Sequence, residues 1–113
     1  MGLNFKQSNA QWSYSGFMSF RERLASEIGL TLREMDGFKD GGNSWDSITD
    51  AIKPFLNHSD CDGELSVDEM KLVAPRLREL VADWEDDHDK ENALELASDM
   101  EALILSGKPL IFT

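Results

Sequence analysis

The chain has 113 residues, which is enough for one small domain and too few for two ordinary ones. Its 22 acidic and 11 basic residues give a net charge of −11, which disfavours binding to nucleic acid phosphates and anionic lipid. The same charge suits cations or a basic protein partner. No apolar run approaches the roughly 20 residues of a membrane-spanning helix, and the first residues lack the apolar core of a signal peptide. We therefore expect a cytoplasmic protein that binds neither membranes nor nucleic acids.

The charge is divided unevenly along the chain. Residues 1–57 hold 6 Lys or Arg and 7 Asp or Glu, whereas residues 58–113 hold 5 Lys or Arg and 15 Asp or Glu. The second part therefore carries a net charge of −10, compared with −1 for the first. This excess has two interpretations. It keeps the protein soluble and gives it the acidic composition typical of calcium-binding proteins, or it attracts a basic partner.

We expect one mainly α-helical domain over residues 12–113, preceded by a flexible N-terminus over residues 1–11. The N-terminal residues are polar and have no helical pattern. In the stretch QWSYSGF, alternation places Trp12 and Tyr14 on one side of the chain, which predicts a short extended piece.

The first helix is predicted from Gly16 to Ile28. Ser15 stands where an N-cap is expected, and Gly29 stands where a glycine commonly ends a helix. Hydrophobic residues recur at the spacing of one helix face, at Phe17, Phe20, Leu24 and Ile28.

Two shorter helical segments are predicted in the middle of the chain. Thr31 and Glu34 have the spacing of a capping box, which would begin a short helix. Ser44 is expected to cap a second helix, which carries Trp45, Ile48 and Ile52. Pro54 lacks the amide that a helix interior needs, so this helix is expected to be kinked or divided there.

A longer helix is predicted after residue 65. Ser66 and Glu69 have the spacing of a capping box at its start, and Pro75 is expected to bend it. Together the helices are expected to enclose one core that buries Phe17, Phe20, Leu24, Trp45, Ile52, Leu65, Leu77, Leu80 and Met100.

The last helix is expected from about Asp89 to Ser106, with Gly107 ending it. The chain then closes with the apolar segment KPLIFT. Because exposure of its Leu, Ile and Phe side chains to water is unfavourable, we expect a short C-terminal strand. Its predicted partner is an extended segment next to Leu65 or Trp12.

The most informative stretch is NHSDCDGELSVDEM, which covers residues 57–70. It resembles the calcium loop of the EF-hand family, whose oxygen ligands come from positions 1, 3, 5, 7, 9 and 12, with glycine at the sharp turn of position 6. Alignment of Gly63 with position 6 places Leu65 at the buried aliphatic position 8. The resemblance covers about thirty residues, and the metal ligands that it implies are Asp60, Asp62, the Glu64 carbonyl, Ser66 and Glu69.

His58 departs from the EF-hand pattern, because it stands at position 1 in place of a carboxylate. Calcium prefers oxygen ligands, whereas imidazole nitrogen suits zinc or copper. Two interpretations remain. Either the other ligands hold calcium weakly, or Asp60 and Asp62 bond to loop amides as Asx turns that keep the loop shape without metal. Since EF-hand loops normally pair at position 8 and only one loop is readable, another short strand is expected to replace the twin.

The sequence predicts no catalytic site. His58 and His88 are the only histidines, and no nucleophile motif, phosphate loop or HExxH pattern accompanies them. The expected function is a non-catalytic EF-hand-like helical module that binds a protein partner, with or without weakly bound calcium. The alternative is an acidic antagonist of the immunity type, which neutralises a basic partner such as a nuclease.

The whole chain also resembles a group of small uncharacterised bacterial and phage-associated proteins. The segments that carry this resemblance are WSYSGF, SWDSI, PFLNHSDCDGELS, APRLREL and GKPLIF. The resemblance implies no function.

Overall fold

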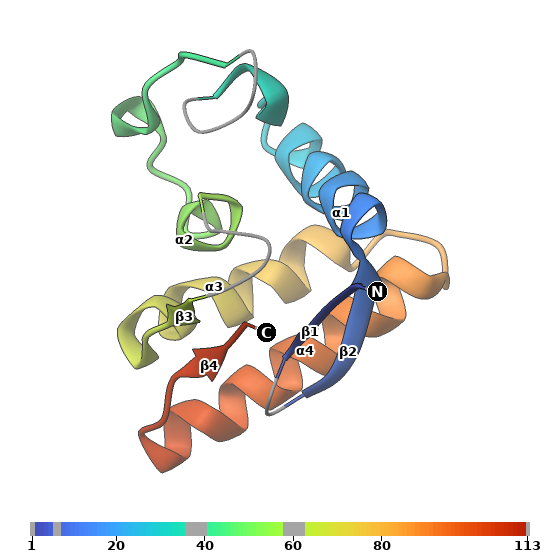
Figure 1. The fold of residues 1–113 in the computed structure, drawn as a ribbon, viewed down its shortest axis with the longest axis vertical. Coiled ribbons are helices and arrows are strands. Elements are labelled where there is room, and N and C mark those ends of the chain that lie inside the picture. Colours follow the sequence, from blue (N-terminus) through green and yellow to red (C-terminus); the bar gives the residue numbers. More distant parts are fainter. Residues whose placement is uncertain (1, 6–7, 36–40, 58–62, 113) are drawn as a thin grey trace.

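A computed structural model of the chain describes residues 2–5, 8–35, 41–57 and 63–112. The described residues form a small, mainly α-helical domain, as the sequence predicts. Figure 1 shows two long helices, α3 and α4, lying beside each other. An N-terminal hairpin lies against α4, and helix α1 continues directly from the second strand of that hairpin. No helix among the described residues has the length and apolar character needed to cross a membrane.

The N-terminal segment is a β-hairpin rather than the irregular, frayed stretch expected for residues 1–11. Strands β1 (Gly2–Phe5) and β2 (Ser8–Ser13) pair antiparallel, and β2 contacts α4. Burial explains the difference, because the side chains of Phe5, Ala10 and Trp12 all lie in the core. The hairpin is therefore held by apolar contacts with distant parts of the chain. The polar local sequence does not indicate these contacts.

Helix α1 (Tyr14–Glu27) begins two residues before the predicted start. Its N-cap is Ser13 instead of Ser15, and the Ser13 hydroxyl accepts a hydrogen bond from the Gly16 amide at 3.0 Å. The helix ends as predicted, because Gly29 has a φ of 74°, in the left-handed region that favours glycine. On the predicted face, Phe17, Phe20 and Leu24 are buried in the core and Ile28 is half-buried.

The middle of the chain contains shorter helices than expected. A 3₁₀ turn, η1 (Leu32–Glu34), follows Thr31, which makes no side-chain capping bond, so the expected capping box is absent. The Ser44 hydroxyl does cap a turn, but that turn is only η2 (Trp45–Ser47). The chain resumes a helix only at α2 (Lys53–Leu56), which has Pro54 in its first turn. The break therefore lies over residues 48–52, before the proline at which a kink or division was expected.

The long helices α3 (Val67–Val81) and α4 (His88–Ser106) pack against each other. Both have caps at their ends. The predicted box at the start of α3 is formed, and Gly107, with a φ of 72°, ends α4 as predicted. Helix α4 starts one residue earlier than expected, because the Asp87 side chain accepts a hydrogen bond from the Lys90 amide.

The C-terminal segment forms the predicted short strand. Strand β4 (Leu110–Ile111) pairs antiparallel with β3 (Glu64–Leu65), which places Leu110 directly opposite Leu65. The Phe112 amide donates to the Gly63 carbonyl at 2.9 Å, and Phe112 also bridges to Phe5 in the hairpin. The C-terminus therefore connects the loop before α3 to the N-terminal strand.

One core joins all of these elements. Every residue predicted to be buried is buried, and a cluster of aromatic rings extends the core from the hairpin to α2. Its tightest contact stacks Trp12 on Phe20, with ring centroids 4.6 Å apart. Rings of this size contribute much of the area that a small domain must bury.

Candidate metal loop and its surroundings

The loop that resembles an EF-hand lies between α2 and α3. Its described part runs from Gly63 to the first turn of α3, whereas His58, Asp60 and Asp62 lie outside the described residues. Gly63 has a φ of 91°, which is the conformation expected at the sharp turn of such a loop.

Leu65, at loop position 8, is fully buried and pairs with Leu110 of β4. In an EF-hand pair, the equivalent strand contact comes from the second loop. In this chain Leu65 pairs with the C-terminal strand β4. Of the two predicted positions for the C-terminal strand, next to Leu65 or next to Trp12, the structure has the first.

Ser66 and Glu69 form a reciprocal capping box. The Ser66 hydroxyl accepts a hydrogen bond from the Glu69 amide at 3.2 Å, and Glu69 Oε1 accepts one from the Ser66 amide at 2.9 Å. Both groups are oxygen donors of the kind that calcium prefers, so their chemistry fits the implied metal. Each already satisfies an amide at the start of α3, so coordination of a cation by these oxygens would compete with the cap.

The described part of the loop holds no cluster of acidic groups that could bind a cation. Among the residues that it describes, no three His, Cys, Asp or Glu side chains lie close enough to hold a metal ion. Glu64 is an exposed residue of β3, and it contributes only its carbonyl in the EF-hand scheme. The described residues alone therefore do not complete a coordination sphere.

A buried cation lies close to the start of the loop. Arg21 of α1 is only 3% exposed, and its Nη1 donates a hydrogen bond to the carbonyl oxygen of Leu56 at 3.2 Å. The guanidinium also lies over the Phe17 ring, 4.8 Å from its centroid. Leu56 precedes the predicted first ligand position by two residues. Arg21 stands four residues after Phe17 and three before Leu24, so the helical spacing places it on the buried face of α1. Its partner at Leu56 has no such signal in the sequence.

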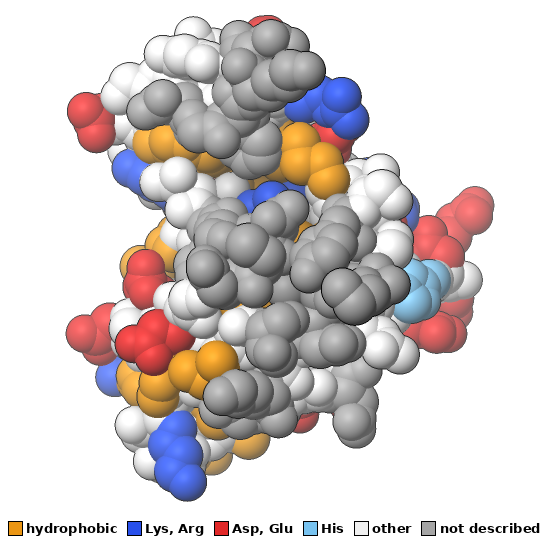
Figure 2. Space-filling view, viewed as in Figure 1, with side chains coloured by type: hydrophobic (Ala, Val, Ile, Leu, Met, Phe, Trp, Pro, Cys, Tyr) orange, Lys and Arg blue, Asp and Glu red, His pale blue; other side chains and the backbone are white. Residues whose placement is uncertain are grey.

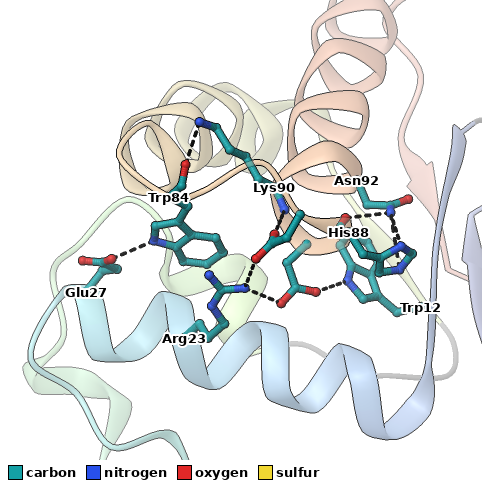
Figure 3. Close-up of polar contacts among 9 residues, drawn as sticks. Trp12, Arg23, Glu27, Trp84, His88, Lys90 and Asn92 are labelled. Carbon is teal, nitrogen blue, oxygen red and sulfur yellow. Dashed lines mark hydrogen bonds and ion pairs between the residues drawn. The ribbon is translucent and has the colours of Figure 1, made fainter.

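A second group of charged residues joins α1 to the start of α4, as Figure 3 shows. Arg23 lies over the Trp84 ring, 3.9 Å from its centroid, and its Nη1 binds Asp89 Oδ2 at 2.7 Å and Asp87 Oδ2 at 3.2 Å. Asp89 also accepts a hydrogen bond from Trp12 Nε1 at 2.9 Å. These contacts fix the hairpin, α1 and α4 relative to one another.

The ionisation of this group follows from its hydrogen bonds. Burial alone would lower the pKa of Arg23, but its bonds to Asp89 and Asp87 raise that pKa above the usual value. The bond from the Lys90 amide is the main cause of a lowered pKa of Asp87. Both shifts favour the charged forms of Arg23 and Asp87.

His88 belongs to the same network. Its Nε2 lies 3.2 Å from the Gln11 carbonyl oxygen, and its ring makes a T-shaped contact with the Trp12 ring. The Asn92 side chain bonds the His88 carbonyl and also lies within hydrogen-bond distance of the ring (Figure 3). These contacts link the hairpin to α4, and no nucleophile is among the contacts described for the ring.

Comparison with protein-family models, with curated proteins and with solved structures finds no match for this chain. The function is therefore inferred from the loop, the charges and the surface of the molecule itself.

Proposed function

We propose that this protein is a non-catalytic helical module with an EF-hand-like loop, which binds a protein partner and holds calcium weakly. The loop pattern of the sequence and the described geometry of its second half support the proposal. The paired Leu65 and Leu110 are the observation that carries it, because this contact reproduces the support that position 8 has in an EF-hand pair.

Three features favour weak rather than tight calcium binding. His58 replaces the first carboxylate, so one negative charge is missing from the ligand set. The buried guanidinium of Arg21 places a positive charge beside the start of the loop. Glu69 must also exchange its bond to the Ser66 amide for the metal. We therefore expect a dissociation constant of about 10⁻⁴ M or weaker, since the number of ligand charges tunes such sites.

Titration calorimetry tests this proposal directly. The wild-type protein should bind calcium weakly, and His58→Asp should bind it more tightly because it restores the missing carboxylate. Thermal unfolding with calcium, compared with unfolding in EDTA, should show a calcium-dependent rise in midpoint that is larger for His58→Asp. Sub-micromolar binding by the wild type would contradict our account of the loop.

A second candidate function is an acidic antagonist that neutralises a basic protein. The observation that favours it is the turn between α3 and α4, where Asp83, Glu85 and Asp86 are exposed. Figure 2 shows acidic side chains gathered beside a histidine at one edge of the molecule. A complex with a basic protein that weakens steeply as salt rises would favour this candidate, whereas calcium-dependent stability would favour the first.

A further inference from the structure

Two side chains near the start of α4 hold one backbone unit of the hairpin. The Gln11 amide donates to Asn92 Oδ1 at 3.0 Å, and the Gln11 carbonyl oxygen lies 3.2 Å from His88 Nε2. Figure 3 shows the His88 and Asn92 side chains beside Trp12 of β2. Because β2 is an edge strand of a two-stranded sheet, the two side chains bind backbone groups that would otherwise be open to water or to another strand.

The neighbours of Asn92 fix the orientation of its side-chain amide. Its oxygen must face the Gln11 N–H, because a backbone amide only donates. Its nitrogen must face the His88 carbonyl oxygen, 2.8 Å away, because a carbonyl only accepts. The same nitrogen lies 3.1 Å from His88 Nδ1 and 3.4 Å from His88 Nε2. Asn92 therefore presents a donor to the ring.

The same reasoning fixes the protonation of the His88 ring in this arrangement. A carbonyl oxygen faces Nε2, so Nε2 carries the proton, and Nδ1 accepts from the Asn92 amide. Only the neutral ring makes both bonds. A second proton, on Nδ1, would place two donors 3.1 Å apart. Asn92 cannot turn its oxygen toward the ring without breaking its bond to Gln11.

The carboxylates on either side of His88 are bound to other donors. Asp87 and Asp89 both form ion pairs with Arg23 of α1. Asp87 also accepts from the backbone at the start of α4, and Asp89 accepts from Trp12 Nε1. Neither carboxylate is therefore placed to accept a hydrogen bond from a protonated Nδ1.

The remaining charges near His88 lie in water or oppose a cation. Glu85 and Glu91 are exposed, so salt screens their attraction, and Asp86 pairs with Lys90 at 3.6 Å. The described residues of the hairpin carry no charged side chain. His88 is the first residue of α4, where the partial positive charge of a helix N-terminus disfavours a second positive charge.

We infer that His88 and Asn92 form a pH-sensitive latch, in which the neutral ring holds the Gln11 backbone to α4 and protonation of the ring opens this contact. Imidazole is the side chain that ordinarily changes charge between about pH 5 and 8, so mild acid is the trigger. Phe5, Ala10 and Trp12 stay in the core, so opening frees the edge of β2 without releasing the hairpin. The latch goes beyond the proposed function, because it uses no residue of the calcium loop.

NMR of the ¹⁵N-labelled full-length protein in EDTA tests the latch. At about pH 7.5, the ring ¹⁵N shifts of His88 should identify a neutral ring protonated at Nε2. Between about pH 7.5 and 5.5, the protection of the Gln11 amide against hydrogen exchange, corrected for the intrinsic rate at each pH, should fall about fivefold, as the loss of one hydrogen bond implies. A ring protonated at Nδ1 at the higher pH, or protection that does not fall, would overturn the inference.

A variant at Asn92 tests the sign of the response. Asn92→Asp replaces the nitrogen that faces the ring by an oxygen, which can accept from a protonated Nδ1 while the other oxygen still accepts from Gln11. Protection of the Gln11 amide should then rise on acidification. Asn43→Asp makes the same change at an exposed residue before η2 and should keep the wild-type fall. A fall in Asn92→Asp as large as that of the wild type, or a rise in Asn43→Asp, would overturn the inference.

A variant at His88 separates the ring from the carboxylates around it. His88→Gln does not titrate, so the protection of the Gln11 amide should be the same at both pH values. Asp87 and Asp89 are still present in this variant. A fall equal to that of the wild type would therefore assign the pH response to carboxylates and would also overturn the inference.

Discussion

Arg76 and Asp50 form a two-point ion pair that joins α3 to the segment in front of α2. The Nε–Oδ1 and Nη2–Oδ2 distances are both 2.9 Å, and Asp50 Oδ1 also accepts a hydrogen bond from the Ile52 amide at 3.1 Å. The bonds from Arg76 lower the pKa of Asp50 below its usual value, although burial acts in the opposite direction. The pair lies where the chain forms no helix between η2 and α2, although a helix was expected there.

We expect Asp50→Asn to lower the free energy of unfolding by about 1 kcal/mol at pH 7. Because the folded-state pKa is lowered, the charged Asp50 stabilises the protein above its unfolded pKa of about 3.9. That stability is lost as the pH falls through the folded-state pKa. Urea unfolding should therefore show a difference in the free energy of unfolding between the wild type and Asp50→Asn at pH 7, and this difference should disappear toward pH 3. A difference in free energy that does not change with pH would contradict the ion-pair explanation. Glu79→Gln, at an exposed residue near Arg76, serves as the control.

The contact between the C-terminal strand and the loop should be important for stability. Leu110 is fully buried, so Leu110→Ala removes apolar contacts and leaves a cavity next to Leu65. We expect the free energy of unfolding to fall by about 2–5 kcal/mol. Leu105→Ala, at a side chain that is 90% exposed, should change it by less than about 0.5 kcal/mol. Chemical denaturation measures both, and equal effects would show that β4 does not support the loop.

Arg23 should hold Trp84 in place at the junction of α1 and α4. Arg23→Ala removes the cation from the indole face and both ion pairs, and we expect a loss of about 1 kcal/mol in the free energy of unfolding. Added salt should narrow this difference, since part of it is an exposed ion pair. Arg33→Ala, which breaks only a more exposed pair with Glu22, should have little effect. Denaturation at low and high salt checks this, and equal losses in the two variants would contradict it.

The sequence predicts those parts of the fold that depend on near neighbours. The capping box of Ser66 and Glu69 lies within four residues, and Gly107 ends α4 through its own backbone conformation. The apolar face of α1 also follows from local spacing. The pairing of the C-terminal strand is predictable for another reason: an exposed apolar segment and a loop position that needs a partner leave few arrangements.

Local patterns are less informative where distant contacts decide the structure. The hairpin is missed because its strands are held by α4 and by aromatic rings from other elements. Thr31 and Glu34 have the spacing of a capping box, yet a turn of three residues forms without that bond. The hydrogen bonds of Arg21 and Arg23 join partners 35 or more residues away, at Leu56, Asp87 and Asp89. No spacing rule in the sequence contains such pairs.

The two roles of Glu69, in the helix cap and as a proposed calcium ligand, can be separated by a pair of substitutions. Glu69→Gln retains a side-chain oxygen that can accept the hydrogen bond from the Ser66 amide, so the capping box remains. Ser66→Ala instead removes the hydroxyl that accepts from the Glu69 amide. In EDTA, we therefore expect Ser66→Ala to lose about 1 kcal/mol of stability and Glu69→Gln to lose much less.

The response to calcium should rank these two variants in the opposite order, with Glu69→Gln the more impaired. Glu69→Gln lacks the carboxylate that the EF-hand pattern requires at position 12, so its unfolding midpoint should be the same in calcium and in EDTA. Ser66→Ala keeps the Glu69 carboxylate and its charge. Its unfolding midpoint should therefore still rise with calcium, by less than the midpoint of the wild type. Thermal unfolding in millimolar calcium measures both. A calcium-dependent rise in Glu69→Gln equal to that of the wild type would place the bound ion elsewhere, and the loop would then serve only as a structural connection between α2 and α3.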